Sequence, residues 1–192
     1  RQKDLKRMIA YSSLSHMGFV ILGSAGLVTL SVSGAMFQQF SHGLIMSILF
    51  MSAGAIQTNT GTRIINNLGG LAKKMPNLAV IMMLGFMASL GLPGLTGFIA
   101  EFLVLAFSYV NLPQFVLLAL LAIVITAGYH LWAIQRAMFG VYNEKLGDVR
   151  DINSLQVFSM AVIALLVVYF GWNPNPVLNM MITNSEAIVS LA

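Results

Sequence analysis

Apolar residues run along this chain in five long blocks, which short polar or Pro/Gly-marked segments separate. The blocks cover about residues 8–30, 35–57, 78–110, 114–139 and 152–172. Each block has at least the roughly 20 residues that an α-helix needs to cross a bilayer. The pattern therefore predicts an all-α integral membrane protein with about five transmembrane helices in a single domain over residues 1–192.

The third block, residues 78–110, is too long for one straight transmembrane helix. An unbroken helix of that length would run roughly 50 Å at 1.5 Å per residue, whereas the hydrocarbon layer is about 30 Å thick. Pro93 removes a backbone donor, and Gly94 and Gly97 loosen the backbone beside it. We therefore predict that this span is broken at residues 91–97.

The sequence after the last block has a different character. Two prolines, Pro174 and Pro176, stop the helix, and the apolar positions of residues 177–192 are loosely spaced. Such spacing is typical of a helix that lies at the membrane interface. We expect an interfacial or partner-packing helix in the tail, residues 173–192.

Composition excludes an ordinary soluble domain. Hydrophobic residues make up 58% of the chain and charged residues 8%, with a mean hydropathy of +0.85. There is no cysteine, so the chain cannot hold a disulfide, an iron–sulfur cluster or a zinc–thiolate site. Phosphate-binding and dinucleotide motifs are absent, and the basic residues lie in short loops, which argues against nucleic acid as a partner.

The basic residues are distributed on one side of the predicted membrane topology. If the chain threads back and forth, all ten Lys and Arg fall in or beside residues 1–7, 58–76 and 140–151, and the opposite loops, 31–34 and 110–113, carry none. Positive charge marks the cytoplasmic side, so we expect the N-terminus and the basic loops there. The chain starts with Arg1 and shows no signal peptide, so we expect it to be a piece of a longer polypeptide.

Besides Arg136 at the end of the fourth block, four ionisable residues fall inside the predicted spans: His16, His42, Glu101 and His130. Such groups are costly at membrane depth, so each is a functional candidate. Glu101 is the only carboxylate within a predicted span. Burial disfavours its charged form and a nearby cation favours it, which is the behaviour that a proton relay needs. The competing interpretation is a paired or protonated Glu101 that braces the helix break.

The histidines admit two interpretations. His42 shares a helix face with Gln38, and His130 follows Thr126 by four residues, so each could order water, carry protons or simply pack. Because His16, His42 and Glu101 lie on different spans, they could also hold zinc, but no further ligand supports that site. Lys6 lies at the start of the first span. The simplest interpretation of its position is that the side chain extends its amine to the membrane interface.

Four segments resemble the antiporter-like membrane subunits of proton-pumping NADH dehydrogenase, respiratory complex I. They are DLKRMIAYSSLSHMG at 4–18, SHGL at 41–44, LGGL at 68–71 and LPGLTGFIAEF at 92–102. The resemblance covers nearly the whole chain in order. It is strongest for the type called subunit M in bacteria and chain 4 in mitochondria, which has a glutamate at the position of Glu101 where sibling subunits have lysine. Met46 fits this type, because siblings tend to have lysine there.

The resemblance implies a fold of about fourteen transmembrane helices with two inverted five-helix repeats, each containing one broken helix. This chain would then be the C-terminal half, with the last five helices and the tail. By the same resemblance, Glu101 is the terminal proton-transfer acid and His42 and His16 are the relay pair. Lys6 matches a lysine of less clear role. His130 departs from the small residue expected at its position.

The function that the resemblance implies is proton translocation by a membrane subunit of a complex I-type dehydrogenase, which uses NADH or a related donor and quinone. We expect no cofactor in this chain, and flavin and iron–sulfur clusters in partner subunits. The implied partners are the bilayer, neighbouring antiporter-like subunits and a peripheral redox arm, in a prokaryotic plasma membrane rather than the mitochondrial inner membrane. Two alternatives stay open: a stand-alone or Mrp-type Na⁺/H⁺ antiporter subunit, and a structural half-subunit that does not pump.

Overall fold

A computed structural model describes residues 2–191, which form helices joined by short connections. In chain order these elements are α1 (Leu5–Ala25), α2 (Thr29–Thr60), η1 (Ile65–Asn67), α3 (Leu71–Lys74), α4 (Pro76–Ser89), α5 (Thr96–Ser108), α6 (Pro113–Met138), η2 (Glu144–Leu146), α7 (Ser154–Trp172) and α8 (Asn175–Val189). The predicted all-α fold is confirmed.

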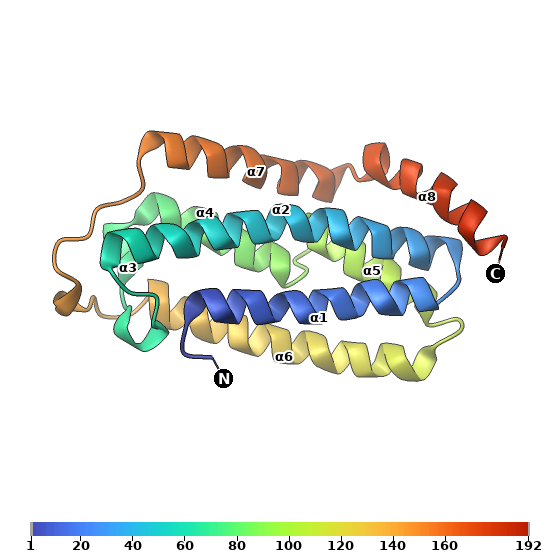
Figure 1. Cartoon of the computed structure of the whole chain (residues 1–192), viewed down its shortest axis with the longest axis horizontal. Coiled ribbons are helices and arrows are strands. Elements are labelled where there is room, and N and C mark those ends of the chain that lie inside the picture. The colour runs from blue at the N-terminus through green and yellow to red at the C-terminus, as the bar shows by residue number, and fades with distance from the viewer. Residues whose placement is uncertain (1, 192) are drawn as a thin grey trace.

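The long helices lie side by side, with α2 packed against α1, α4, α5, α7 and α8 (Figure 1). Four of them, α1, α2, α6 and α7, are long and apolar enough to cross a membrane. The shorter apolar helices α4 and α5, with 14 and 13 residues, follow one another along α2 (Figure 1). Together they form the third predicted span, which is broken as expected.

The break occupies residues 90–95, between the end of α4 and the start of α5. Gly91 and Gly94 have φ values of +68° and +92°, in the region that favours glycine. Pro93 stands between them, where its missing N–H costs no helical hydrogen bond. The predicted roles of Pro93 and Gly94 in breaking the helix therefore fit the backbone. Gly97, also predicted to lie in the break, is instead the second residue of α5.

Close packing of three backbone segments surrounds the break. A Cβ on Gly97 would lie 2.0 Å from the carbonyl oxygen of Ala88, and one on Gly171 would lie 2.3 Å from the carbonyl oxygen of Gly94. Any side chain at Gly97 or Gly171 would therefore force backbone apart. The C-terminal end of α7 thus closes over the break between α4 and α5.

The first predicted turn is in the wrong place. Instead of residues 31–34, the chain turns at residues 26–28, so α1 ends before residue 30 and α2 starts before residue 35. Ser31 Oγ bonds the N–H and C=O of Val28, and Ser33 Oγ donates to the carbonyl of Thr29 at 2.7 Å. Because the helix backbone satisfies both hydroxyls, these serines open α2 rather than interrupt it.

Gly34, which also suggested a turn, has a packing role instead. A Cβ at this position would lie 2.8 Å from Leu103 Cβ and 2.9 Å from the Val104 backbone nitrogen. Its lack of a side chain lets α2 and α5 approach closely, as small residues do between transmembrane helices. The sequence pattern could not distinguish this role from that of a turn.

The start of α1 is tied to the connection that follows α2. The Arg63 side chain pairs with the carboxylate of Asp4, and the Leu5 N–H donates to the Arg63 carbonyl at 2.9 Å. The Ile65 N–H donates to the Lys3 carbonyl at 2.8 Å. These bonds form a clasp between residues 3–5 and 63–65, at the opposite end of the α1–α2 pair from the turn at 26–28.

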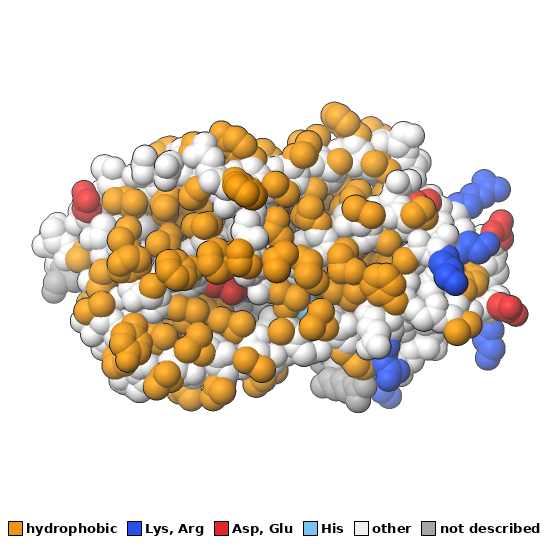
Figure 2. All heavy atoms as spheres, turned by 180° about the vertical axis from the view of Figure 1, so that it is seen from behind, with side chains coloured by type: hydrophobic (Ala, Val, Ile, Leu, Met, Phe, Trp, Pro, Cys, Tyr) orange, Lys and Arg blue, Asp and Glu red, His pale blue; other side chains and the backbone are white. Residues whose placement is uncertain are grey.

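The face of the molecule drawn in Figure 2 is broadly apolar, and the Lys and Arg side chains visible on it gather at one end. This distribution agrees with the predicted loops on one side of a membrane. Which side is cytoplasmic stays a prediction.

The tail helix α8 packs against the beginning of α2. Ser185 Oγ lies 2.6 Å from Ser33 Oγ, and Leu178 belongs to a small apolar cluster with Phe37 and Ala100. A helix in the tail was predicted, and its packing on α2 follows from these contacts. Its position at a membrane interface stays a prediction.

Candidate functional site

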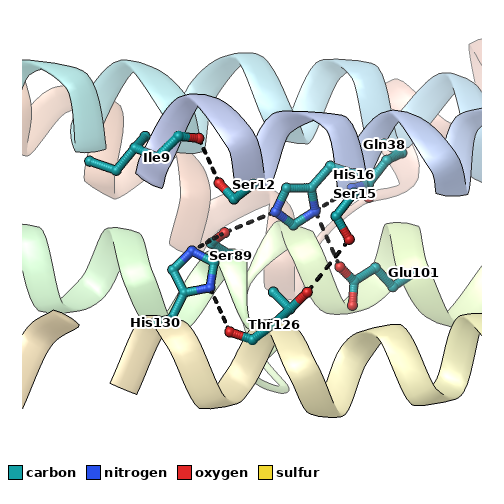
Figure 3. A network of polar contacts seen from close by, with 9 residues as sticks. All are labelled: Ile9, Ser12, Ser15, His16, Gln38, Ser89, Glu101, Thr126 and His130. Carbon is teal, nitrogen blue, oxygen red and sulfur yellow. Dashed lines mark hydrogen bonds and ion pairs between the residues drawn. The ribbon is translucent and has the colours of Figure 1, made fainter. Parts of the chain in front are cut away.

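Glu101 lies in the second turn of α5, just beyond the break, and only 8% of its surface is exposed. Its Oε1 is 3.5 Å from Nδ1 of His16 on α1 (Figure 3). A Cβ on Gly91 would lie 2.7 Å from Glu101 Oε2, so the glycine in the break leaves the space that the carboxylate occupies. The break therefore places the acid directly beside an imidazole.

His16 is the centre of the cluster and is 4% exposed. Its Nδ1 faces the Gln38 amide at 3.3 Å as well as Glu101, and its Nε2 lies 3.0 Å from Ser89 Oγ. Each ring nitrogen therefore has a polar partner from a different helix: α2 and α5 on one side, α4 on the other. Such partners fix the ring while leaving both nitrogens able to exchange protons.

His130 of α6 is fully buried and joins the same cluster. Its Nδ1 lies 2.9 Å from the Thr126 carbonyl oxygen, and its Nε2 lies 3.4 Å from Ser89 Oγ (Figure 3). Its ring packs against Phe86 and Tyr129, with centroid distances of 5.1 and 4.6 Å. The structure thus links this residue to His16 through one serine hydroxyl.

The other two predicted site residues differ in position. His42 of α2 is half-buried, and its ring centroid is 5.2 Å from that of His16. Lys6 is exposed in the first turn of α1, ten residues or about 15 Å along the helix from His16. The structure therefore brings together Glu101, His16, His42 and His130 but leaves Lys6 away from them.

Two members of the cluster were not foreseen from the sequence. Ser89 is not among the site residues that the sequence indicates, and the sequence pattern pairs Gln38 with His42 rather than with His16. The Gln38 side chain extends from α2 to His16 on α1, and Ser89 is the last residue of α4. Their contacts depend on how separate helices pack, for which the sequence offers only the weak signal of polar residues in apolar runs.

A cavity of about 10 Å³ adjoins the cluster, with Ser15, His16, Ser89, Glu101 and Thr126 among its lining residues. That volume is close to the minimum for one water molecule. Ser15 and Thr126, whose hydroxyls are 3.5 Å apart, also line a groove of about 780 Å³ between α1 and α6. The hydroxyl pair therefore separates the buried cluster from a much larger space.

The arrangement suits proton exchange. Imidazole both accepts and donates protons near neutral pH, and hydroxyls can pass them on. Within residues 2–191, three or more His, Cys, Asp or Glu do not come together as a metal-binding group. The chemistry of the cluster is thus that of one carboxylic acid and two imidazoles connected by polar contacts, with a third imidazole, that of His42, packed against His16.

Comparison with known proteins identifies relatives of the whole chain. Residues 1–126 match the family model described as "NADH:quinone oxidoreductase/Mrp antiporter, TM". F(420)H(2) dehydrogenase subunit M of Methanosarcina mazei is 88% identical over 192 residues, which is 100% of this chain and 39% of that protein. NADH-quinone oxidoreductase subunit M of Rickettsia felis is 40% identical over 189 residues, 98% of this chain and 38% of that protein.

Among solved structures, a chain of respiratory complex I from Thermus thermophilus superposes with a TM-score of 0.91 at 32% identity. The match covers 99% of this chain and 40% of that chain. The chain thus spans about two fifths of the length of these relatives, and nearly all of it has a counterpart in them.

Proposed function

We propose that this chain, which belongs to the NADH:quinone oxidoreductase/Mrp antiporter transmembrane family, moves protons within a redox-driven membrane complex. The observation that carries the proposal is the contact between Glu101 and His16. A carboxyl group and an imidazole meet at 3.5 Å inside apolar helices, next to a break in one of them. Family membership supports the same function, and the residue roles are our proposal.

The proposed step is a proton transfer from the Glu101 carboxylic acid to Nδ1 of His16. The transfer leaves a carboxylate beside an imidazolium, and each favours the charged form of the other. The contact of 3.5 Å must shorten to hydrogen-bond length for this step. A small rotation of the Glu101 side chain is sufficient, because the cavity adjoins its carboxylate.

His42 is the proposed next site of the relay. Its ring is 5.2 Å from that of His16, so a proton on one ring disfavours a proton on the other. Repulsion of this kind lets the arrival of one proton promote the departure of another. His42 is half-buried whereas His16 is buried, so we assign His42 as the member of the pair through which protons leave or enter the cluster.

The complex that we propose for this chain oxidises F(420)H(2), since the relative at 88% identity is named as a subunit of that dehydrogenase. Flavin and iron–sulfur clusters would then be in partner subunits of a peripheral arm, with other antiporter-like subunits beside this one. The location would be a prokaryotic plasma membrane. In this arrangement the redox energy reaches the chain through its neighbours, and its own residues hold and move protons.

Glu101→Gln in the assembled complex tests the proposal. We expect proton uptake coupled to donor oxidation to fall at least about tenfold, because an amide cannot release a proton and positioned acid–base groups contribute 10²–10⁴-fold to rates. Vesicles that contain the complex allow donor oxidation and proton uptake to be measured together. Glu186→Gln on α8 makes the same chemical change at an exposed position and should leave both rates unchanged.

Three other results would count against the proposal. Normal proton uptake with Glu101→Gln would remove Glu101 from the relay. A complex that no longer assembles would favour a structural brace at the break. Sodium-dependent proton uptake without an electron donor would instead support an Na⁺/H⁺ antiporter.

A further inference from the structure

We propose that the Ser89 hydroxyl passes protons between His16 and His130, which makes His130 a second buried proton-holding site on a branch away from Glu101. This inference rests on the proposed function of the Glu101–His16 pair and extends it. Its basis is a chain of three contacts: His16 Nε2 to Ser89 Oγ at 3.0 Å, Ser89 Oγ to His130 Nε2 at 3.4 Å, and His130 Nδ1 to the Thr126 carbonyl at 2.9 Å.

The Thr126 carbonyl sets the direction of these hydrogen bonds. A carbonyl only accepts, so Nδ1 of His130 must donate to it. In neutral His130 the other nitrogen, Nε2, is then unprotonated and accepts from the Ser89 hydroxyl. The Ser89 oxygen is left to accept from Nε2–H of His16. One backbone group thereby leaves Nδ1 of His16 as the unprotonated nitrogen, and that atom faces Glu101.

This polarity permits a concerted transfer in which every proton is accounted for. The Glu101 O–H bond breaks as an N–H bond forms at His16 Nδ1. The His16 Nε2–H bond breaks as its proton joins Ser89 Oγ, and the original Ser89 proton moves to His130 Nε2. Glu101 ends as a carboxylate, His16 as the other neutral tautomer, Ser89 as a hydroxyl again, and His130 as an imidazolium.

Gln38 can follow the change of tautomer. As placed, its Nε2 donates to the unprotonated Nδ1 of His16, while its Oε1 is buried and has no hydrogen-bond partner within residues 2–191. After the transfer Nδ1 carries a proton. A half-turn of the Gln38 amide would then present Oε1 to that proton, so both tautomers of His16 have a suitable partner.

His130 is a store rather than a passage. Within residues 2–191 its two ring nitrogens bond only to Ser89 and the Thr126 carbonyl, and its ring is enclosed by Phe86 and Tyr129. The carbonyl cannot pass a proton onward. A proton on His130 must therefore return through Ser89, and while it stays there it repels a second proton from His16.

The test compares two isosteric substitutions at Ser89 in the assembled complex. Ser89→Thr and Ser89→Val add the same bulk, but only threonine keeps the hydroxyl. Valine also fills the space that a smaller residue would leave open. A water molecule could enter such a space, since the adjoining cavity is close to one water in size, and could replace the hydroxyl. In the proposed branch Glu101 gives up its proton as His130 gains one in each cycle, so loss of the Ser89 hydroxyl slows every cycle. We therefore expect the rate of coupled proton uptake to be roughly tenfold lower for Ser89→Val than for Ser89→Thr.

Ser52 supplies the matched control. It is also a buried serine, and among the residues that the structure describes its hydroxyl bonds only to the Ile48 carbonyl of its own helix α2. Ser52→Thr and Ser52→Val should give equal rates. His130→Gln is the second variant, since its amide can still face Ser89 but cannot hold a proton, and it should reproduce the loss seen with Ser89→Val.

The results separate this inference from the proposed function. Equal rates for Ser89→Thr and Ser89→Val, or a normal rate for His130→Gln, would overturn the branch while Glu101→Gln still abolished coupled uptake. A normal rate for Glu101→Gln would overturn the proposed function itself. If both Ser89 variants fail to assemble, the rate of His130→Gln decides the outcome.

Discussion

At the scale of single residues, Gly91 sets how closely backbone approaches the buried carboxylate. It has a φ of +68°, and its missing side chain leaves the space next to Glu101 Oε2. Two requirements therefore coincide at one position: a left-handed backbone and room for the acid. A residue that satisfied only one of these requirements would either strain the backbone or displace the carboxylate.

We predict that Gly91→Ala destabilises the chain by roughly 1–2 kcal/mol, the cost of a left-handed conformation for a residue with Cβ. It should also lower proton uptake per donor oxidised, because the new methyl group would lie 2.7 Å from Glu101 Oε2 and displace the carboxylate from His16. Thermal unfolding of the purified complex and proton uptake in vesicles measure the two effects.

Gly61→Ala separates strain from displacement. Gly61 has a similar φ of +70°, and nothing lies within 4 Å of a Cβ built there. This variant should lose comparable stability and keep normal proton uptake. If the two variants behave alike in uptake, the close approach to Glu101 is not important for the relay.

Individual chemical groups in the cluster could be predicted only in part. Glu101, His16 and His42 stand out because ionisable residues are rare in apolar segments, and the structure places them together. Ser89 is one of many serines in the chain, and its position between two rings depends on the packing of α1, α4 and α6. No local pattern encodes that contact.

At the scale of elements, the break depends on a helix that is distant in sequence. Gly171, near the end of α7, packs on the backbone of Gly94 and Leu95, and a Cβ there would lie 2.5 Å from Leu95 Cα. The unpaired backbone of a broken helix is tolerated in a membrane only where protein covers it. The end of α7 provides that cover.

We therefore predict that Gly171→Ala destabilises the complex by about 1–3 kcal/mol through overpacking. Gly54→Ala in α2 is the control, since nothing lies within 4 Å of a Cβ at that position. Thermal unfolding of the two variants should show a lower midpoint for Gly171→Ala only. Equal midpoints would mean that α7 can shift away from the break without cost.

Elements differ in how well the sequence predicts them. The break follows from the length of an apolar run together with Pro93 and its neighbouring glycines, because length alone does not break a helix: α2 is continuous over 32 residues. The turn between α1 and α2 was misplaced, because Ser31 and Gly34 look like turn residues until their roles in capping and in helix contact are known. In a membrane protein, small and hydroxyl-bearing residues occur both in turns and within or between helices, so the sequence pattern does not distinguish these roles.

At the scale of the whole molecule, the distribution of Lys and Arg predicts the orientation in the membrane (Figure 2). These 192 residues contain no cysteine, so single cysteines placed in them are the only thiols of this segment. We expect Lys145→Cys to react with a membrane-impermeant maleimide from the cytoplasmic side and Ser190→Cys from the opposite side. The unmodified chain should show no labelling, and reaction of both cysteines from one side would contradict five membrane crossings.

The clasp between residues 3–5 and 63–65 restricts how α1 can move relative to α2. Helices α1 and α2 are joined covalently by a three-residue turn at one end and by Asp4, Arg63 and backbone bonds at the other. A pair held at both ends cannot slide lengthwise without breaking one of them. His16 and His42 therefore keep a fixed relative position along the two helices. In the proposed relay, proton transfer between these two rings then depends on side-chain rotation and proton movement, and not on sliding of α1 past α2.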